Sequence, residues 1–205
     1  MLLDQNKFVV KSQAKLLSSK KSFEIVDADS GTILGTAKDT TGFFPAILGL
    51  TTIEVRDISD NSLLFTISRT GLLFKKDQVL DPQGQVLARY KAKIFSLSGG
   101  FNVYDKDGKP ITEIQGKMLK AEYKFVAPDK TEMGSVSRTW GGIAKSLLGT
   151  GNSYGVQIDP KYAADKTAKI IMIGATIAVE TIFKKKKSSS GGSSSGGGES
   201  GGGDE

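Results

Sequence analysis

An uncharged, apolar run near the C-terminus constrains the fold of this chain more than any other feature. Residues 170–179 read Ile-Ile-Met-Ile-Gly-Ala-Thr-Ile-Ala-Val and separate Lys169 from Glu180. Successive side chains of an α-helix are about 100° apart, so the side chains of such a run point in every direction. A helix of this kind has no face for water and must be surrounded by apolar material.

Three structures are open for this run: a buried helix, a strand and a membrane anchor. Ile, Val and Thr favour strands, but the run is long for a strand, and Asp159 followed by Pro160 is typical of a helix N-cap and first turn. A membrane-spanning helix needs about 20 apolar residues, and this run has about half that number. Extension of the run to Phe183 would include Glu180, whose charge is costly in the middle of a membrane. We therefore predict a buried helix and keep membrane insertion of residues 168–183 as the less favoured alternative.

Upstream of the helix, one pattern occurs five times at intervals of 22 to 30 residues. Each copy is an alternating apolar and polar run, a turn rich in Asp, Asn, Gly or Pro, and a second extended run. Such a unit is typical of a β-hairpin with one buried face. The predicted pairs are 23–27 with 32–37, 53–57 with 63–68, 78–81 with 85–91, 101–105 with 110–115 and 123–126 with 132–137, and residues 8–11 and 154–158 add two strands.

A sheet of about 12 strands would curl or leave long edges, and closure into a barrel removes them. A barrel of that size is too wide for its own side chains to fill. At 1.5 Å per residue, a helix over 170–183 spans roughly 21 Å, close to the roughly 20 Å of a six-residue strand. We therefore predict a mainly β fold, a closed antiparallel barrel around a central C-terminal helix. The predicted filling residues are Ile170, Ile171, Met172, Ile173, Gly174, Ala175, Ile177, Ala178 and Val179, with Gly174 and Ala178 keeping one stripe of the helix narrow.

Composition limits the function of this single predicted domain, residues 1–187. The remaining residues, 188–205, are Ser and Gly with three acids and are expected to be disordered. The chain has no Cys and no His, which removes thiol nucleophiles, zinc sites and most general-base chemistry. The sequence shows no pairing of a nucleophile with a base and no phosphate-binding loop. The apolar stretch at the N-terminus is too short, and is followed too soon by charged residues, to be a signal peptide. We expect a binding protein and not an enzyme.

A net charge of +6 has two interpretations, an anionic partner such as lipid headgroups or nucleic acid, or ordinary solubility. Lys184, Lys185, Lys186 and Lys187 follow the helix directly. Two interpretations are open: a solvated cationic end that complements the helix C-terminus, or a contact to an anionic lipid surface, where each lysine contributes about 1 kcal/mol. Nucleic acid is not expected, because the aromatic residues alternate in core positions instead of forming a stacking platform.

The apolar segment 42–50 lies between two predicted hairpins and contains Phe43 and Phe44. It either packs over one end of the barrel or forms a loop that enters a bilayer or a partner. In the second case Phe43 and Phe44 join the four lysines as lipid-binding residues.

Residues 137–143, 154–157 and 172–175 resemble, in order and spacing, segments of the phospholipid scramblase family, which belongs with the tubby-like C-terminal domains and the plant LURP-one-related proteins. The resemblance covers about residues 5–183 and is most specific over 137–183. It implies a twelve-stranded barrel around a C-terminal helix. It also implies a lipid-associated protein at the cytoplasmic face of a membrane, peripheral at the plasma membrane, with phospholipid binding and phospholipid scrambling as its activities. The alternative is a soluble LURP-one-related interaction module.

This chain departs from the scramblase pattern at the segment proposed to bind calcium. Thr150 and Asn152 occupy that acidic segment, and Lys161 occupies a later acidic position. Calcium requires several carboxylate oxygens, so no calcium and no other cofactor are expected. The turns 27–31 and 105–108 also lack the ligands of calcium loops. The family's cysteine cluster and proline-rich N-terminal extension are missing as well.

Overall fold

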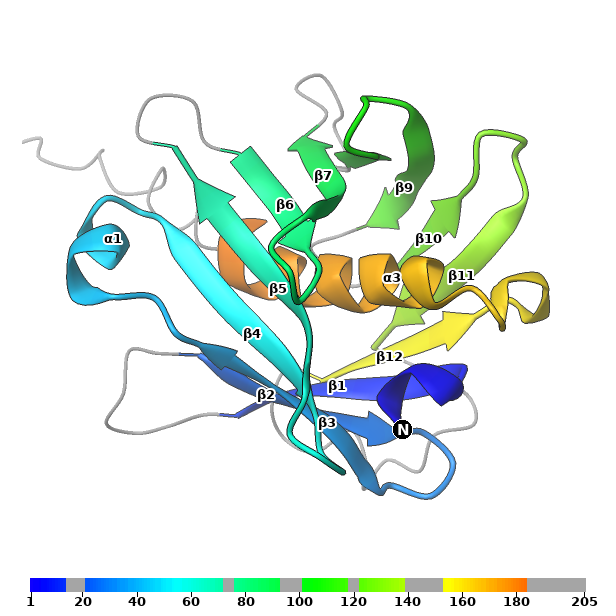
Figure 1. Cartoon of the computed structure of the whole chain (residues 1–205). Helices are drawn as coiled ribbons and strands as arrows, with labels where there is room; N and C mark the ends of the chain where they lie inside the picture. Colours follow the sequence, from blue (N-terminus) through cyan, green and yellow to red (C-terminus); the bar gives the residue numbers. More distant parts are fainter. Residues whose placement is uncertain (14–20, 72–75, 93–100, 118–121, 139–152, 184–205) are drawn as a thin grey trace, which may run out of the picture.

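The computed structural model is a closed antiparallel barrel of twelve strands around a central helix, which confirms the predicted fold class (Figure 1). It describes residues 1–13, 21–71, 76–92, 101–117, 122–138 and 153–183. Every strand pairs with its neighbours in sequence, and β12 closes the barrel on β1. The strands are β1 (Lys7–Gln13), β2 (Ser22–Asp27), β3 (Ile33–Asp39), β4 (Thr51–Asp57), β5 (Leu63–Thr70), β6 (Lys76–Leu80), β7 (Val86–Ala92), β8 (Phe101–Tyr104), β9 (Pro110–Lys117), β10 (Glu122–Val126), β11 (Glu132–Ser137) and β12 (Ser153–Ile158).

The five predicted hairpins are all present, and each has a register shift beside its turn. One residue of each turn has positive φ, as such a bulged turn requires. Asn61 and Lys130 adopt this conformation at 58° and 69°, and glycine does so in the other three turns. An aspartate accepts backbone N–H bonds within every turn, as Asp81 does from Gln83 and Gln85. The turn chemistry therefore sets the register of each hairpin.

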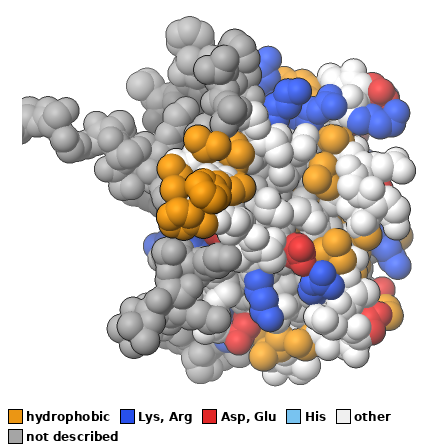
Figure 2. All heavy atoms as spheres, turned by 60° about the vertical axis from the view of Figure 1, so that its left-hand side comes forward, with side chains coloured by type: hydrophobic (Ala, Val, Ile, Leu, Met, Phe, Trp, Pro, Cys, Tyr) orange, Lys and Arg blue, Asp and Glu red, His pale blue; other side chains and the backbone are white. Residues whose placement is uncertain are grey.

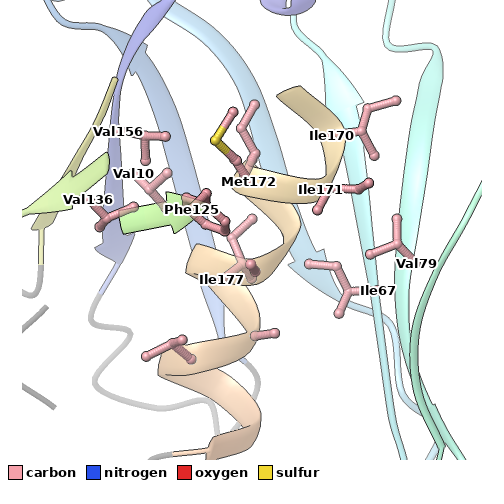
Figure 3. Close-up of a cluster of buried hydrophobic side chains, with 14 of the residues drawn as sticks. Val10, Ile67, Val79, Phe125, Val136, Val156, Ile170, Ile171, Met172 and Ile177 are labelled. Atoms are coloured by element: carbon pink, nitrogen blue, oxygen red, sulfur yellow. The ribbon is translucent and has the colours of Figure 1, made fainter. Parts of the chain in front are cut away.

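The apolar run forms helix α3 (Lys166–Ala178), which continues as the π-helical turn η4 (Val179–Phe183). All residues from Ala168 to Thr181 are buried. Figure 3 shows why no face remains for water: Ile170 and Ile171 point toward Ile67 and Val79, whereas Met172 lies on the side of Val10 and Phe125. This enclosure excludes the strand and membrane-anchor alternatives for the run.

The start of the helix differs from the prediction. Asp159 and Pro160 cap and open a separate turn, η3 (Pro160–Tyr162), in which the Asp159 carboxylate accepts from the N–H of Lys161. The cap of α3 is Asp165, whose carboxylate accepts from Ala168 N at 2.9 Å. The cap-and-proline signal thus marks one turn that precedes the helix, because proline at that position fits a short 3-10 turn as well as an α-helix.

At Gly174 the barrel wall approaches the helix closely. A Cβ at Gly174 would lie 2.9 Å from the Tyr90 hydroxyl oxygen and 3.2 Å from a Val79 methyl group. The Tyr90 hydroxyl donates to the Ile171 carbonyl oxygen at 3.2 Å, and burial raises its pKa well above the usual value. The helix is therefore narrow at Gly174, as predicted. The space beside Gly174 is occupied by Tyr90, whose hydroxyl is hydrogen-bonded to the helix backbone.

The N-terminus closes one end of the barrel, a feature that the sequence did not indicate. The short turn η1 (Leu2–Asp4) buries Leu2 in the core. Lys169 of α3 is buried, and its Nζ donates to the Leu3 carbonyl oxygen at 2.8 Å. Burial lowers the pKa of Lys169. The backbone N–H of Leu2 donates to the carboxylate of Asp57 at 2.8 Å, which links η1 to β4.

Asp57 provides a pH-dependent contribution to stability. Burial raises the pKa of its carboxyl, but hydrogen bonds from Ser59 and Leu2 outweigh that effect, so the pKa lies below its usual value. The contribution is therefore present above the unfolded pKa of about 4 and is lost as the pH falls through the folded pKa. We expect Asp57→Asn to lower the free energy of unfolding by about 1–2 kcal/mol at pH 7 in urea denaturation.

At pH 3 the difference in the free energy of unfolding between Asp57→Asn and the unsubstituted protein should be smaller. Asp107→Asn, in an exposed turn, is the matched control and should change little at either pH. A difference that stays the same from pH 7 to pH 3 would contradict a role for the Asp57 charge.

Candidate functional site

The two ends of the barrel are built differently because alternate connections of an antiparallel barrel lie at opposite ends. One end, here called the turn end, carries the five tight hairpin turns, η1 and the start of α3. The other end, the loop end, carries the remaining strand connections and η4. Helix α1 (Phe43–Ile47), between β3 and β4, belongs to the loop end, and Figure 1 shows it on the same side as the C-terminal end of the central helix.

The surface of α1 is apolar and exposed. Phe43, Phe44, Ile47 and Leu48, the apolar patch, have exposed fractions of 75%, 77%, 66% and 51%. Figure 2, which brings this side of the molecule forward, shows hydrophobic side chains gathered in one patch. The interpretation that this segment packs over the barrel is therefore wrong for these four residues. Large side chains exposed together in this way are typical of a contact to a partner or a membrane.

The base of the α1 segment is held by hydrogen bonds to the barrel. Thr41 is buried, and its hydroxyl oxygen accepts from Thr52 N at 2.8 Å while its own N–H donates to the Asp39 carboxylate at 2.9 Å. Leu50 N donates to the Pro45 carbonyl oxygen at 2.9 Å, which closes the segment on itself. The rings of Phe43 and Phe44 meet edge to face with centroids 5.7 Å apart. The apolar patch is thus presented by an ordered support.

A buried polar cluster fixes the C-terminal end of the helix. Glu180 is buried in η4 and accepts a hydrogen bond from the Tyr154 hydroxyl of β12. Arg138 donates to the same hydroxyl at 3.2 Å, and its guanidinium lies 5.2 Å from the centroid of the Tyr154 ring. Arg138 and Tyr154 belong to the segments that resemble scramblases, so the structure brings these residues together around Glu180. The cluster supplies partners for a charge that is costly to bury alone.

Hydrogen bonds connect the helix end to the α1 segment. Lys21 Nζ donates to the Glu180 carbonyl oxygen at 2.8 Å, and Lys21 O accepts from Asp39 N at 3.0 Å. Asp39 in turn accepts from Thr41 beside α1. The four predicted lipid-binding lysines, Lys184, Lys185, Lys186 and Lys187, lie outside the described residues. In the sequence they follow Phe183 directly.

Charge is distributed unequally between the two ends. Each tight turn at the turn end carries aspartate, including Asp29, Asp60 and Asp129. Five sequences between consecutive strands, 14–20, 72–75, 93–100, 118–121 and 139–152, lie outside the described residues and contain six lysines and no Asp or Glu. The α1 connection, 40–50, contains no charged residue at all. The strand connections other than the tight turns are therefore basic in sequence or, in the case of the α1 connection, uncharged.

The remaining predicted site positions lie elsewhere. Thr150 and Asn152 fall outside the described residues. Lys161 lies in η3 at the turn end, where its Nζ is 3.7 Å from Asp129 Oδ2. Within the described ranges, no three acidic side chains are grouped so that they could hold a metal ion. None of the helices in the described part of the chain is both long and apolar enough to cross a membrane.

The fold and this surface define a class: a twelve-stranded barrel with an enclosed helix and an exposed apolar patch at one end. Comparison of the chain with protein-family models, with curated proteins and with solved structures gave no match.

Proposed function

We propose that this protein associates with lipid at the cytoplasmic face of a membrane and binds the anionic phospholipid surface through its loop end. The observation that carries the proposal is the apolar patch of Phe43, Phe44, Ile47 and Leu48, exposed at the loop end of the barrel. The resemblance to the phospholipid scramblase family favours the same kind of partner.

The apolar patch supplies the hydrophobic part of the interaction. Full burial of a Phe, Ile or Leu side chain is worth about 1.5–3 kcal/mol, so entry of the patch into the headgroup boundary contributes several kcal/mol. Phe43 and Phe44 are adjacent on a short helix whose base is held at Thr41. An ordered support reduces the entropy that is lost when the patch binds.

The basic residues supply the electrostatic part. Four lysines after Phe183 contribute about 1 kcal/mol each near an anionic leaflet, and the six lysines of the loop-end connections have the same sign. The aspartates of the hairpin turns are at the opposite end, so a bound barrel directs them away from the membrane. This polarity orients the molecule with the barrel axis pointing toward the lipid.

Scrambling of lipid between leaflets, which the resemblance implies, is not part of this proposal, because α3 is enclosed and offers no apolar surface to lipid. The alternative function is a LURP-one-related module in which the same apolar patch binds a protein. Vesicle binding distinguishes the two, because only the membrane proposal requires anionic lipid.

We expect co-sedimentation with vesicles containing phosphatidylserine, weaker co-sedimentation with phosphatidylcholine alone, and loss of binding as salt increases. The double substitution Phe43→Ser and Phe44→Ser should weaken binding at least about tenfold, since tenfold corresponds to about 1.4 kcal/mol. Substitution of Lys184, Lys185, Lys186 and Lys187 by Ala should weaken it about a thousandfold at low salt, since the four lysines together contribute about 4 kcal/mol, and much less at high salt.

The matched control is Ile58→Ser, which removes an apolar side chain that is 52% exposed at the turn end. It should bind vesicles as the unsubstituted protein does. If the unsubstituted protein does not bind anionic vesicles at low salt, the membrane proposal is wrong. If Ile58→Ser and the Phe43/Phe44 variant lose binding equally, the loop end is not the contact surface.

A further inference from the structure

A pocket of about 410 Å³ lies on the outer wall of the barrel, over β6, β7 and β8. Its size falls in the range of small-molecule sites. It is separate from the apolar patch, which lies between β3 and β4. Its lining includes Lys76, Asp77, Arg89, Lys91, Tyr104 and Asp105.

The alternation of β7 places two cations on this wall. Arg89 and Lys91 are exposed, whereas Ala88 and Tyr90 between and beside them are buried in the barrel. Tyr104 of β8 is paired directly opposite Arg89. Lys76, at the start of β6, contributes a third exposed cation. The pocket is thus lined by three positive charges and two tyrosines, Tyr104 and the buried Tyr90.

The two acidic residues of the pocket are already bonded to other groups. Asp77 accepts from the Arg69 guanidinium at 2.6 and 2.8 Å. Asp105 accepts from the backbone N–H groups of Asp107 and Lys109 at 2.9 and 2.8 Å. Among the described residues, neither Lys76 nor Lys91 has an acidic partner within 4 Å. The pocket therefore carries excess positive charge.

The donors that face the pocket suit a phosphate group. Arg89 donates through Nη1 to the Lys106 carbonyl oxygen at 2.7 Å, which orients the guanidinium and leaves its other N–H groups for an anion. The Tyr104 hydroxyl accepts from Asn102 Nδ2 at 3.3 Å, so its own proton can be donated. A phosphate monoester carries −1.5 to −2 charge at pH 7 and three acceptor oxygens.

We propose that the pocket over β6, β7 and β8 binds a phosphate monoester through Arg89, Lys91 and Lys76, with Tyr104 as a neutral donor. The phosphate can belong to a free molecule or to the headgroup of a lipid such as phosphatidic acid. This inference goes beyond the proposed function, because it concerns a different surface and a specific ligand group instead of a charged membrane in general.

The test uses the full chain and two probes. Glycerol 3-phosphate, followed by calorimetry or by amide chemical shifts at low salt, represents the free phosphate. Vesicles with phosphatidic acid, compared with vesicles matched in charge by phosphatidylserine, represent the lipid. The test variant is Arg89→Gln with Lys91→Gln. The control is Lys38→Gln with Lys117→Gln, two exposed lysines outside the pocket, and circular dichroism verifies that both variants fold.

We expect glycerol 3-phosphate to bind, and the Arg89/Lys91 variant to weaken it at least about tenfold while the control variant does not. Preference for phosphatidic acid over phosphatidylserine, lost in the same variant, would identify a lipid as the source of the phosphate. The proposal is overturned if neither probe binds, or if the two variants bind alike. Phosphatidylserine binding that still depends on Phe43 and Phe44 would leave the membrane proposal intact in that case.

Discussion

Replacement of Ile173 by Asp is expected to unfold the protein. Ile173 is 0% exposed at the middle of α3 and is surrounded by the barrel. The substitution loses about 1.5–3 kcal/mol of apolar burial and leaves a carboxyl group without a partner, which costs several kcal/mol more. The sum is comparable with the whole stability of a typical domain, 5–15 kcal/mol. Circular dichroism and thermal denaturation should show loss of the cooperative transition.

The matched control for this change is Ile58→Asp, because Ile58 is exposed in a hairpin turn and its replacement buries no charge. That variant should unfold at nearly the temperature of the unsubstituted protein. A folded, soluble Ile173→Asp variant would show that the helix is an appendage of the barrel and not its core.

The substitution Gly134→Ala is expected to be strongly destabilising. Gly134 lies on β11, and a Cβ there would be 2.3 Å from the Gln157 carbonyl oxygen and 2.9 Å from the Met172 sulfur. The backbone of β12 cannot move away without breaking its pairing with β11 and β1, so the strain is not relieved by one flexible side chain. We expect a loss of about 3 kcal/mol, at the upper end for overpacking.

A loss of that size corresponds to a decrease in Tm of about 6–12 °C for a chain of this length. Gly42→Ala is the comparison, because its Cβ would meet only Pro45, at 3.5 Å and beyond. It should lower Tm by no more than about 2 °C. If the two alanine variants have the same Tm, the contact between β11 and β12 is not tight in solution.

The strands and the central helix could be predicted because each depends on local patterns. Alternation in runs such as 53–57 sets one buried face per strand, and residues such as Gly84 and Gly108 mark the turns by their positive φ. The enclosure of α3 follows from a helix without a polar face. The exact start of α3 could not be predicted, since Asp159 and Asp165 are both suitable caps, and tertiary packing decides which one begins the long helix.

The candidate site could be predicted only in part. Phe43 and Phe44 stood out as large apolar residues in a connection, but whether they pack on the barrel or face solvent depends on the path of that connection. Arg138, Tyr154 and Glu180 were separate features of the sequence, and only the closed barrel places them in one buried cluster. The pocket residues Arg89 and Tyr104 belong to different strands and carried no local signal.

The sequence by itself determined the elements of this protein: twelve amphipathic strands, the turns that pair them, and one helix that must be enclosed. These follow from side-chain periodicity and turn chemistry, which act between residues close together in the chain. The tertiary structure alone decided which surfaces remain for other molecules. Closure of β12 on β1 and the alternation of the connections separate a turn end that is rich in aspartate from a loop end that exposes α1. The reason is that exposure and charge polarity arise from residues far apart in sequence, which become neighbours only when the barrel closes.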